Sequence, residues 1–164
     1  MKTIKKITLG ALFAAIITVF TAYICHVPIG INGGYVHLGD AFIYIAASLL
    51  PLPYAILAAA VGAGLADLLT APVWFLASVI IKSLICLSFT NKKIICKRNI
   101  FACVLGVFIT VLGYAVAEYI IFGSFAGILY SVVGNLIQAT ASGVLFILIG
   151  FYIEKIRIND IIKL

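Results

Sequence analysis

The segment Gly33-Gly34-Tyr35-Val36-His37-Leu38-Gly39-Asp40-Ala41 is the most polar and turn-rich stretch between two apolar runs of this chain. It contains three glycines, one of the two histidines and one of only five acidic residues. Glycine clusters between periodic segments mark loops. Because the chain has few other polar groups, we expect this segment to form a loop over a small-molecule site, followed by a helix that begins near Gly39-Asp40.

The composition excludes an ordinary soluble domain. Hydrophobic residues make up 65% of the chain and charged residues 10%, and the mean hydropathy is +1.30. Average soluble proteins are about 45–50% apolar and about 25% charged. The apolar runs have the length of helices and not of ten-residue alternating strands, which argues against a β-barrel. We therefore expect an all-α, multi-pass protein of the cell membrane, with residues 1–164 as one membrane domain.

Apolar runs separated by turn-forming residues predict six transmembrane helices, with an outer gating loop over about 26–38 between the first two. The first run, from Ile7 to Cys25, is longer than the apolar part of a usual signal peptide, so we expect it to be retained as a helix. The second is short for a span and is expected to be tilted or buried against protein. The predicted helices cover about 7–25, 39–50, 54–69, 72–89, 100–122 and 128–153.

The net charge of +6 comes from basic residues that flank the apolar runs. With six spans, all three basic clusters fall on one side of the membrane, which the positive-inside rule assigns to the cytoplasm. This arrangement predicts that both termini are cytoplasmic, and it is a topology signal rather than a nucleic-acid-binding patch. The clusters are Lys2, Lys5 and Lys6; Lys92, Lys93, Lys97 and Arg98; and Lys155, Arg157 and Lys163.

Lys82 lies inside an apolar run, where an unpaired charge costs about 2.5–3.5 kcal/mol on insertion scales. Asp67 and Glu118 are the candidate partners, and we expect a structural ion pair between Lys82 and Asp67. Asp40 is placed to accept hydrogen bonds from the free N–H groups of the first turn of its helix, so we predict that it is a helix cap.

Small residues recur at every fourth position of the first predicted helix, in the pairs Gly10/Ala14 and Ala11/Ala15. Such strips let a second helix come close in lipid. Either packing within the bundle or docking to a partner membrane subunit would use them.

Chemical motifs are few. The four cysteines form no C-x-x-C pair, and no histidine lies at metal-ligand spacing, so we expect neither a metal nor a cofactor. The chain has no G-x-x-x-x-G-K-[ST] nucleotide-binding stretch, so any ATP-driven work must come from a partner. Nothing forms a catalytic constellation, which argues against a membrane enzyme.

In the six-helix topology the polar residues fall almost entirely in the outer half. A transport path would need polar groups through the whole depth, whereas a binding cup needs them only near the outer end. The pattern favours capture of a ligand over a stand-alone carrier or channel, which is the alternative. These residues are His26, Asn32, Tyr35, His37, Asp40, Asp67, Trp74, Tyr114, Glu118, Tyr130, Asn135 and Gln138.

Several segments in a fixed order carry a family resemblance. They are the Ala11/Ala15 strip, the segment 34–41, Gly62-Ala63-Gly64-Leu65-Ala66-Asp67-Leu68-Leu69 with the following Ala-Pro turn, and Lys82. Together they resemble the substrate-binding S component of an energy-coupling factor (ECF) vitamin transporter, over essentially the full chain. The resemblance implies a six-helix membrane protein that works with a transmembrane T subunit and two ATPase subunits.

The resemblance also implies roles for particular residues. The small-residue strip of the first helix meets the T subunit in this family, which assigns partner docking to Ala11 and Ala15. The ligand is contacted by the loop after the first helix and by the last three helices. We see neither the thiamine nor the biotin pattern, so we expect a pyridoxine-like or hydroxymethylpyrimidine-like ligand. By position, the ligand-binding residues are Tyr35, His37, Trp74, Tyr114, Glu118, Asn135 and Gln138.

Overall fold

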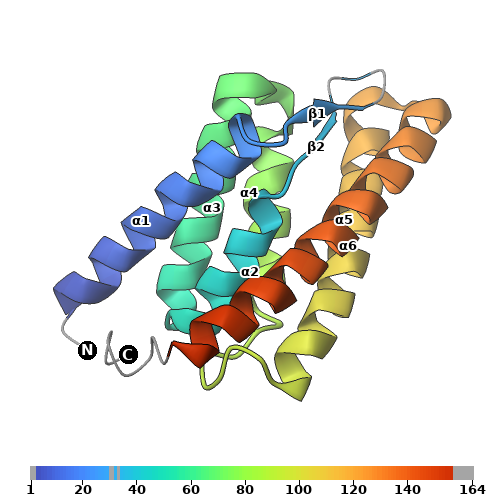
Figure 1. Cartoon of the computed structure of the whole chain (residues 1–164). Helices are drawn as coiled ribbons and strands as arrows, with labels where there is room; N and C mark the ends of the chain where they lie inside the picture. The colour runs from blue at the N-terminus through green and yellow to red at the C-terminus, as the bar shows by residue number, and fades with distance from the viewer. Residues whose placement is uncertain (1–2, 30–31, 33, 157–164) are drawn as a thin grey trace.

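The structure, a computed structural model, describes residues 3–29, 32 and 34–156, which form a bundle of six α-helices (Figure 1). Of the residues discussed above, Gly33, Lys2, Arg157 and Lys163 lie outside this part of the chain. The helices are α1 (Thr3–Ala22), α2 (Gly39–Leu49), α3 (Leu52–Thr70), the 3-10 helix η1 (Pro72–Trp74), α4 (Phe75–Cys86), α5 (Lys97–Phe122) and α6 (Phe125–Lys155).

The helices differ in length. At 1.5 Å per residue, α1 and α3 measure about 30 Å, whereas α5 and α6 measure about 39 and 46 Å. These four are long and apolar enough to cross a membrane. The other two are shorter apolar helices, with 11 residues in α2 and 12 in α4. The fourth predicted helix, 72–89, begins as η1 and ends at Cys86 in the structure.

A short β-hairpin lies where the sequence predicted only an irregular loop. Strand β1 (Val27–Pro28) pairs antiparallel with β2 (Tyr35–Val36), and the Ile29 N–H donates to the Gly34 carbonyl at 2.8 Å. β-Branched and aromatic side chains favour extended backbone, but two residues per strand are too few to show a period in the sequence. The hairpin lies at one end of the bundle (Figure 1).

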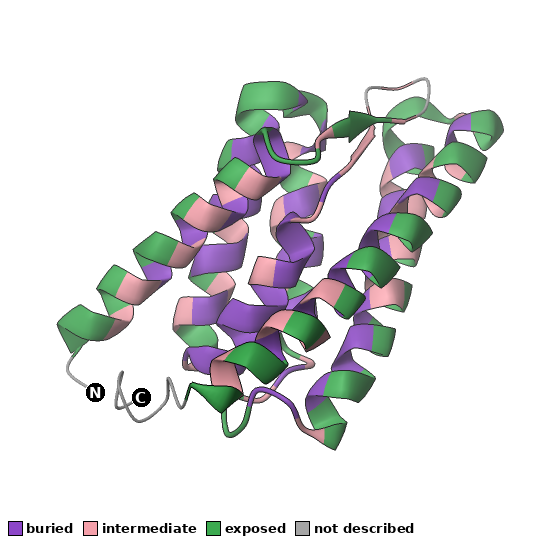
Figure 2. Ribbon diagram, viewed as in Figure 1, coloured by how far each residue is buried: buried purple, intermediate pink, exposed green. Residues whose placement is uncertain are grey.

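Helix α2 is the centre of the bundle (Figure 2). All of its residues except Phe42 are buried, and it contacts α1, α3, α4 and α6. Its residues are apolar or small around almost the whole circumference, which is typical of a helix enclosed on all sides. The outward faces of the other helices carry exposed large apolar side chains, such as Ile120 and Phe125. These faces suit contact with lipid, so the protein is membrane-embedded.

The two small-residue pairs of α1 face in different directions. Gly10 and Ala14 are buried on the side of α3, where a Cβ added to Gly62 would lie 2.9 Å from the Ala14 carbonyl oxygen. Ala11 and Ala15 are exposed on the outside of the bundle. One pair therefore permits close packing of α1 on α3, and the other is free to meet a second molecule.

Candidate functional site

A cavity of about 60 Å³ lies under the β1–β2 hairpin, between the hairpin and α3, η1, α4, α5 and α6. The structure brings all seven residues that the resemblance assigned to ligand binding to the wall of this one cavity. Whether they bind a ligand stays a prediction. The lining residues are Ile29, Asn32, Gly34, Tyr35, Val36, His37, Asp67, Trp74, Ser78, Tyr114, Glu118, Gly127, Tyr130, Ser131, Gly134, Asn135 and Gln138.

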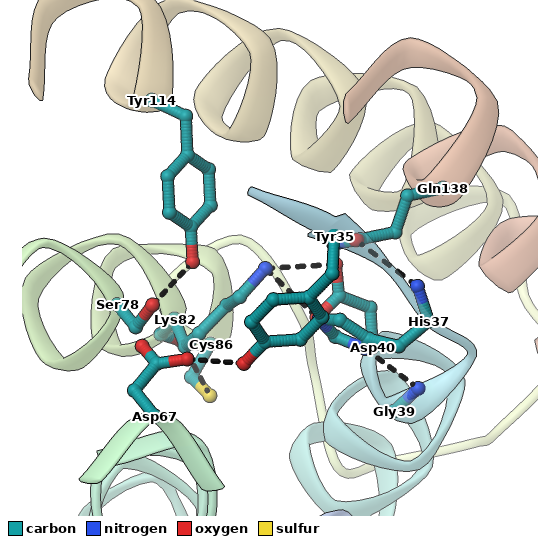
Figure 3. A network of polar contacts seen from close by, with 10 residues as sticks. All are labelled: Tyr35, His37, Gly39, Asp40, Asp67, Ser78, Lys82, Cys86, Tyr114 and Gln138. Atoms are coloured by element: carbon teal, nitrogen blue, oxygen red, sulfur yellow. Dashed lines mark hydrogen bonds and ion pairs between the residues drawn. The ribbon is translucent and has the colours of Figure 1, made fainter. Parts of the chain in front are cut away.

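Two carboxylates hold the described residues of the segment 27–37, which contains the hairpin and is called the hairpin segment below, over the cavity. The Tyr35 hydroxyl donates a hydrogen bond to Asp67 Oδ1 of α3 (Figure 3), and the Asn32 side-chain amide donates to Glu118 Oε1 of α5. Burial, followed by the nearby Asp67 carboxylate, raises the pKa of Tyr35 well above its usual range, so its hydroxyl remains a donor. The His26 ring stacks on Tyr35 at a centroid distance of 4.0 Å.

The predicted ion pair of Lys82 with Asp67 is wrong. Lys82 Nζ lies 2.9 Å from both carboxylate oxygens of Asp40, and both side chains are fully buried. Asp67 accepts from Tyr35 instead, and Glu118, the other candidate, accepts from Asn32. The reason is the depth of α2. This helix starts inside the bundle, so its first turn, which contains Asp40, lies level with Lys82 in the middle of α4.

The predicted role of Asp40 as a helix cap is also wrong. The N-cap position of α2 is Leu38, whose side chain has no polar atom, and Asp40 is the second residue of the helix. Its carboxylate accepts from Lys82 and, at 3.0 Å, from the Gln138 side-chain amide. Lys82 Nζ also lies 5.0 Å from the centroid of the Tyr114 ring, within the range of a cation–π contact. The buried charges are therefore matched directly beneath the cavity.

Gln138 connects the hairpin segment to this buried pair. Its side-chain nitrogen donates to Asp40, and its Oε1 accepts from the His37 backbone N–H at 3.3 Å (Figure 3). The Gly39 N–H in turn donates to Nδ1 of His37 at 3.0 Å. Burial lowers the pKa of His37 to about 3, because an imidazolium in this position would lose its hydration. His37 is therefore a neutral acceptor that fixes the turn into α2.

Protonation of His37 is expected to couple the stability of the fold to pH. Unfolded chains protonate histidine below about pH 6.5, whereas folded His37 resists protonation down to about pH 3. The unfolded state then binds more protons, so stability falls as the pH drops through this window, by roughly 1.4 kcal/mol per unit. Thermal unfolding between pH 7 and 4.5 should show a steeper loss in the wild type than in His37→Asn, which keeps an acceptor. Equal slopes would contradict this role.

Aromatic side chains form one wall of the cavity. The Trp74 ring meets Tyr114 edge-on at a centroid distance of 5.9 Å and lies 5.7 Å from Phe122. Trp74 is buried. It belongs to η1, at the outer end of the fourth predicted helix, and is turned into the bundle. The Ser78 hydroxyl shares a hydrogen bond of 2.5 Å with the Tyr114 hydroxyl.

Ser78 is a cavity residue that the sequence reasoning missed. A signal was present, since Trp74, Ser78 and Lys82 follow one another at intervals of four residues. On a helix such residues share a face. Once Lys82 and Trp74 were placed inside the bundle, Ser78 between them had to point the same way.

The chain is similar to known proteins at the level of a family and of an individual sequence. The model of a family described as "ECF-type riboflavin transporter, S component" matches residues 1–155. A protein of Pyrococcus woesei described as "Uncharacterized protein in gap 3'region" is 28% identical over 146 residues, which cover 87% of this chain and 97% of that protein.

Proposed function

The chain belongs to the ECF-type riboflavin transporter S component family, and we propose that it captures a small vitamin or vitamin precursor in the cavity under its hairpin. The observation that carries the proposal is the convergence of aromatic, amide and carboxylate side chains on that cavity. Pockets with apolar walls and a few directed polar groups are the usual sites for small molecules. The family is one of transporter components, so we assign the chain no catalytic step.

The orientation follows from charge. The described basic residues other than Lys82 lie near the start of α1, between α4 and α5, at the start of α5, and at the end of α6, opposite the hairpin (Figure 1). The positive-inside rule supports a cytoplasmic position for that end. We propose six membrane-embedded helices with both termini cytoplasmic, so that the cavity opens to the outside.

The core below the ion pair supports capture rather than conduction. Tyr44 stacks on Phe89 at 5.1 Å, and Phe146 lies edge-on to both rings at 6.1 and 5.7 Å. All three side chains are buried. This aromatic cluster closes the bundle beneath the polar site, as expected of a cup and not of a channel.

The size of the cavity bears on the substrate. An apolar cavity of about 150 Å³ takes up benzene, and the cavity here is about 60 Å³. The cavity wall would therefore have to move less to admit a compact single-ring heterocycle than to admit riboflavin. Riboflavin, which the family description names, has three fused rings. We propose a pyridoxine-like or hydroxymethylpyrimidine-like ligand, stacked against Trp74 and Tyr114.

The exposed Ala11 and Ala15 support a partner. A strip of small residues on a lipid-facing helix allows another backbone to approach closely. We propose that this strip docks the transmembrane T subunit of an ECF transporter, whose two ATPase subunits supply the energy.

Mass spectrometry of small molecules released from the detergent-purified protein tests the function directly. We expect a vitamin or precursor at close to one per protein. Titration with riboflavin, pyridoxine and 4-amino-5-hydroxymethyl-2-methylpyrimidine then ranks the candidates. Release of lipid alone, together with no binding across this panel, would overturn the capture function. Tightest binding of riboflavin would keep it and exclude the single-ring ligand.

A further inference from the structure

The two carboxylates that hold the hairpin also face the cavity. Asp67 and Glu118 both belong to its wall, and each uses one oxygen for the hairpin segment, Asp67 Oδ1 for Tyr35 and Glu118 Oε1 for Asn32. A carboxylate has two oxygens and about four acceptor positions. Each group therefore has accepting capacity beyond its bond to the hairpin.

Asp67 leaves that capacity unused in a buried position. Its side chain is 2% exposed, and Oδ2 has no hydrogen-bond partner among the described residues. Ser78 lies beside it (Figure 3) and shares a hydrogen bond with Tyr114 in which either oxygen can donate, so the Ser78 hydroxyl offers this carboxylate a neutral donor but no counter-charge. Trp74 lines the same cavity and is 5% exposed, and its Nε1–H also has no acceptor in the described part of the chain. Unsatisfied buried polar groups are costly, so a ligand that pairs both would gain that free energy.

The charge of these carboxylates is not matched within the cavity wall. Among the described residues, neither Lys nor Arg lines the cavity. The ammonium group of Lys82 lies beneath it and is paired with Asp40. His37 accepts from the Gly39 N–H at Nδ1 and is neutral. The wall thus presents carboxylate oxygens without a counter-charge of its own.

We propose that the cavity selects a basic nitrogen heterocycle without a phosphate group. A protonated ring nitrogen or exocyclic amine of the ligand donates to Asp67 Oδ2 and faces Glu118, while an acceptor on the ligand takes the Trp74 N–H. The positive charge replaces the missing counter-charge, and a phosphate ester is repelled by the same carboxylates. This inference rests on the proposed function, because it takes the cavity as the capture site.

Matched ligands test the charge separately from the shape. Isothermal titration of the purified full chain would compare 4-amino-5-hydroxymethyl-2-methylpyrimidine with its 4-oxo analogue and with its phosphate monoester. We expect the amine to bind at least about tenfold more tightly than either of the others, as for the loss of one hydrogen bond to a charged group.

Variants assign the effect to the carboxylates. Asp67→Asn is expected to weaken binding of the amine by about tenfold to a hundredfold, and to change binding of the oxo analogue only a few-fold. Glu118→Gln should act in the same direction and serves if Asp67→Asn does not fold. Glu154→Gln is the matched control, because Glu154 is bonded to the Ile95 N–H outside the cavity wall. Its affinities should equal those of the wild type.

The outcomes separate the two proposals. If a heterocycle binds but the oxo analogue equals the amine, or if both cavity variants leave the amine affinity unchanged, the charge selection is overturned and capture stands. If no heterocycle binds the wild-type protein, both proposals fall.

Discussion

Replacement of Lys82 with Met is expected to destabilise the fold by about 3–5 kcal/mol, because it leaves the Asp40 carboxylate buried without its counter-charge. This is a large fraction of the stability of a typical domain. Asp40 would retain only the Gln138 amide as a neutral donor. The measurement is the fraction of folded, monodisperse protein in detergent, followed on heating.

Two comparisons show whether the loss comes from the pair. Lys93→Met is the control, since Lys93 is 65% exposed and lies 3.9 Å from Glu154, and surface pairs of this kind contribute roughly 0–1 kcal/mol. Adding Asp40→Asn to Lys82→Met should restore much of the stability, whereas adding Asp67→Asn should not. Equal stability of the Lys82 and Lys93 variants would contradict the assignment, and rescue by Asp67→Asn would restore the pair expected from the sequence.

Replacement of Ala15 with Trp is expected to abolish uptake while leaving ligand binding intact. Ala15 is exposed on α1, away from the cavity wall, so a large side chain there would block a close-packed partner without touching the site. Overpacking of a helix contact costs about 1–3 kcal/mol, which corresponds to roughly a fivefold to 150-fold loss of partner affinity. Uptake in cells and ligand affinity of the purified protein should both be measured.

Leu112→Trp provides the matched control on α5. Leu112 is 62% exposed and already large, so the substitution adds bulk to a lipid-facing surface outside the small-residue strip. We expect normal uptake. Loss of ligand binding in Ala15→Trp would mean that the strip supports the bundle itself. Unchanged uptake would instead favour a stand-alone carrier.

The sequence was sufficient for the membrane class and the family, because both depend on composition and on the order of segments along the chain. Through the family resemblance it also indicated seven of the residues that line the cavity, because that resemblance assigns ligand contacts to the first loop and the last three helices. It could not identify the partner of Lys82. That choice depends on the depth at which α2 begins, and Asp40 and Asp67 look alike when only their helix positions are known.

The small residues of α1 show the same limit. Gly10/Ala14 and Ala11/Ala15 have the same spacing, yet one pair packs on α3 and the other faces outward. Spacing defines a face of the helix, and the rotation of the helix in the bundle decides what that face meets. The hairpin was missed for a different reason, since its strands are shorter than the repeat that identifies a strand.

The unequal helix lengths have a consequence for the bilayer itself. A hydrocarbon layer of about 30 Å matches α1 and α3, but α5 and α6 exceed it by about 9 and 16 Å. The charged ends of these two helices, Lys97 and Arg98 of α5 and Glu154 and Lys155 of α6, can lie in the headgroup region. The apolar remainder of this wall is still longer than the hydrocarbon layer, so it tilts or draws thicker lipid around it, while the wall formed by α1 and α3 need not. Hydrophobic mismatch costs fractions of a kcal/mol per Å. A change in the length of the lipid acyl chains therefore changes the mismatch differently on the two sides of the protein. Membrane thickness in this way helps to set the angle between the bundle and the membrane normal.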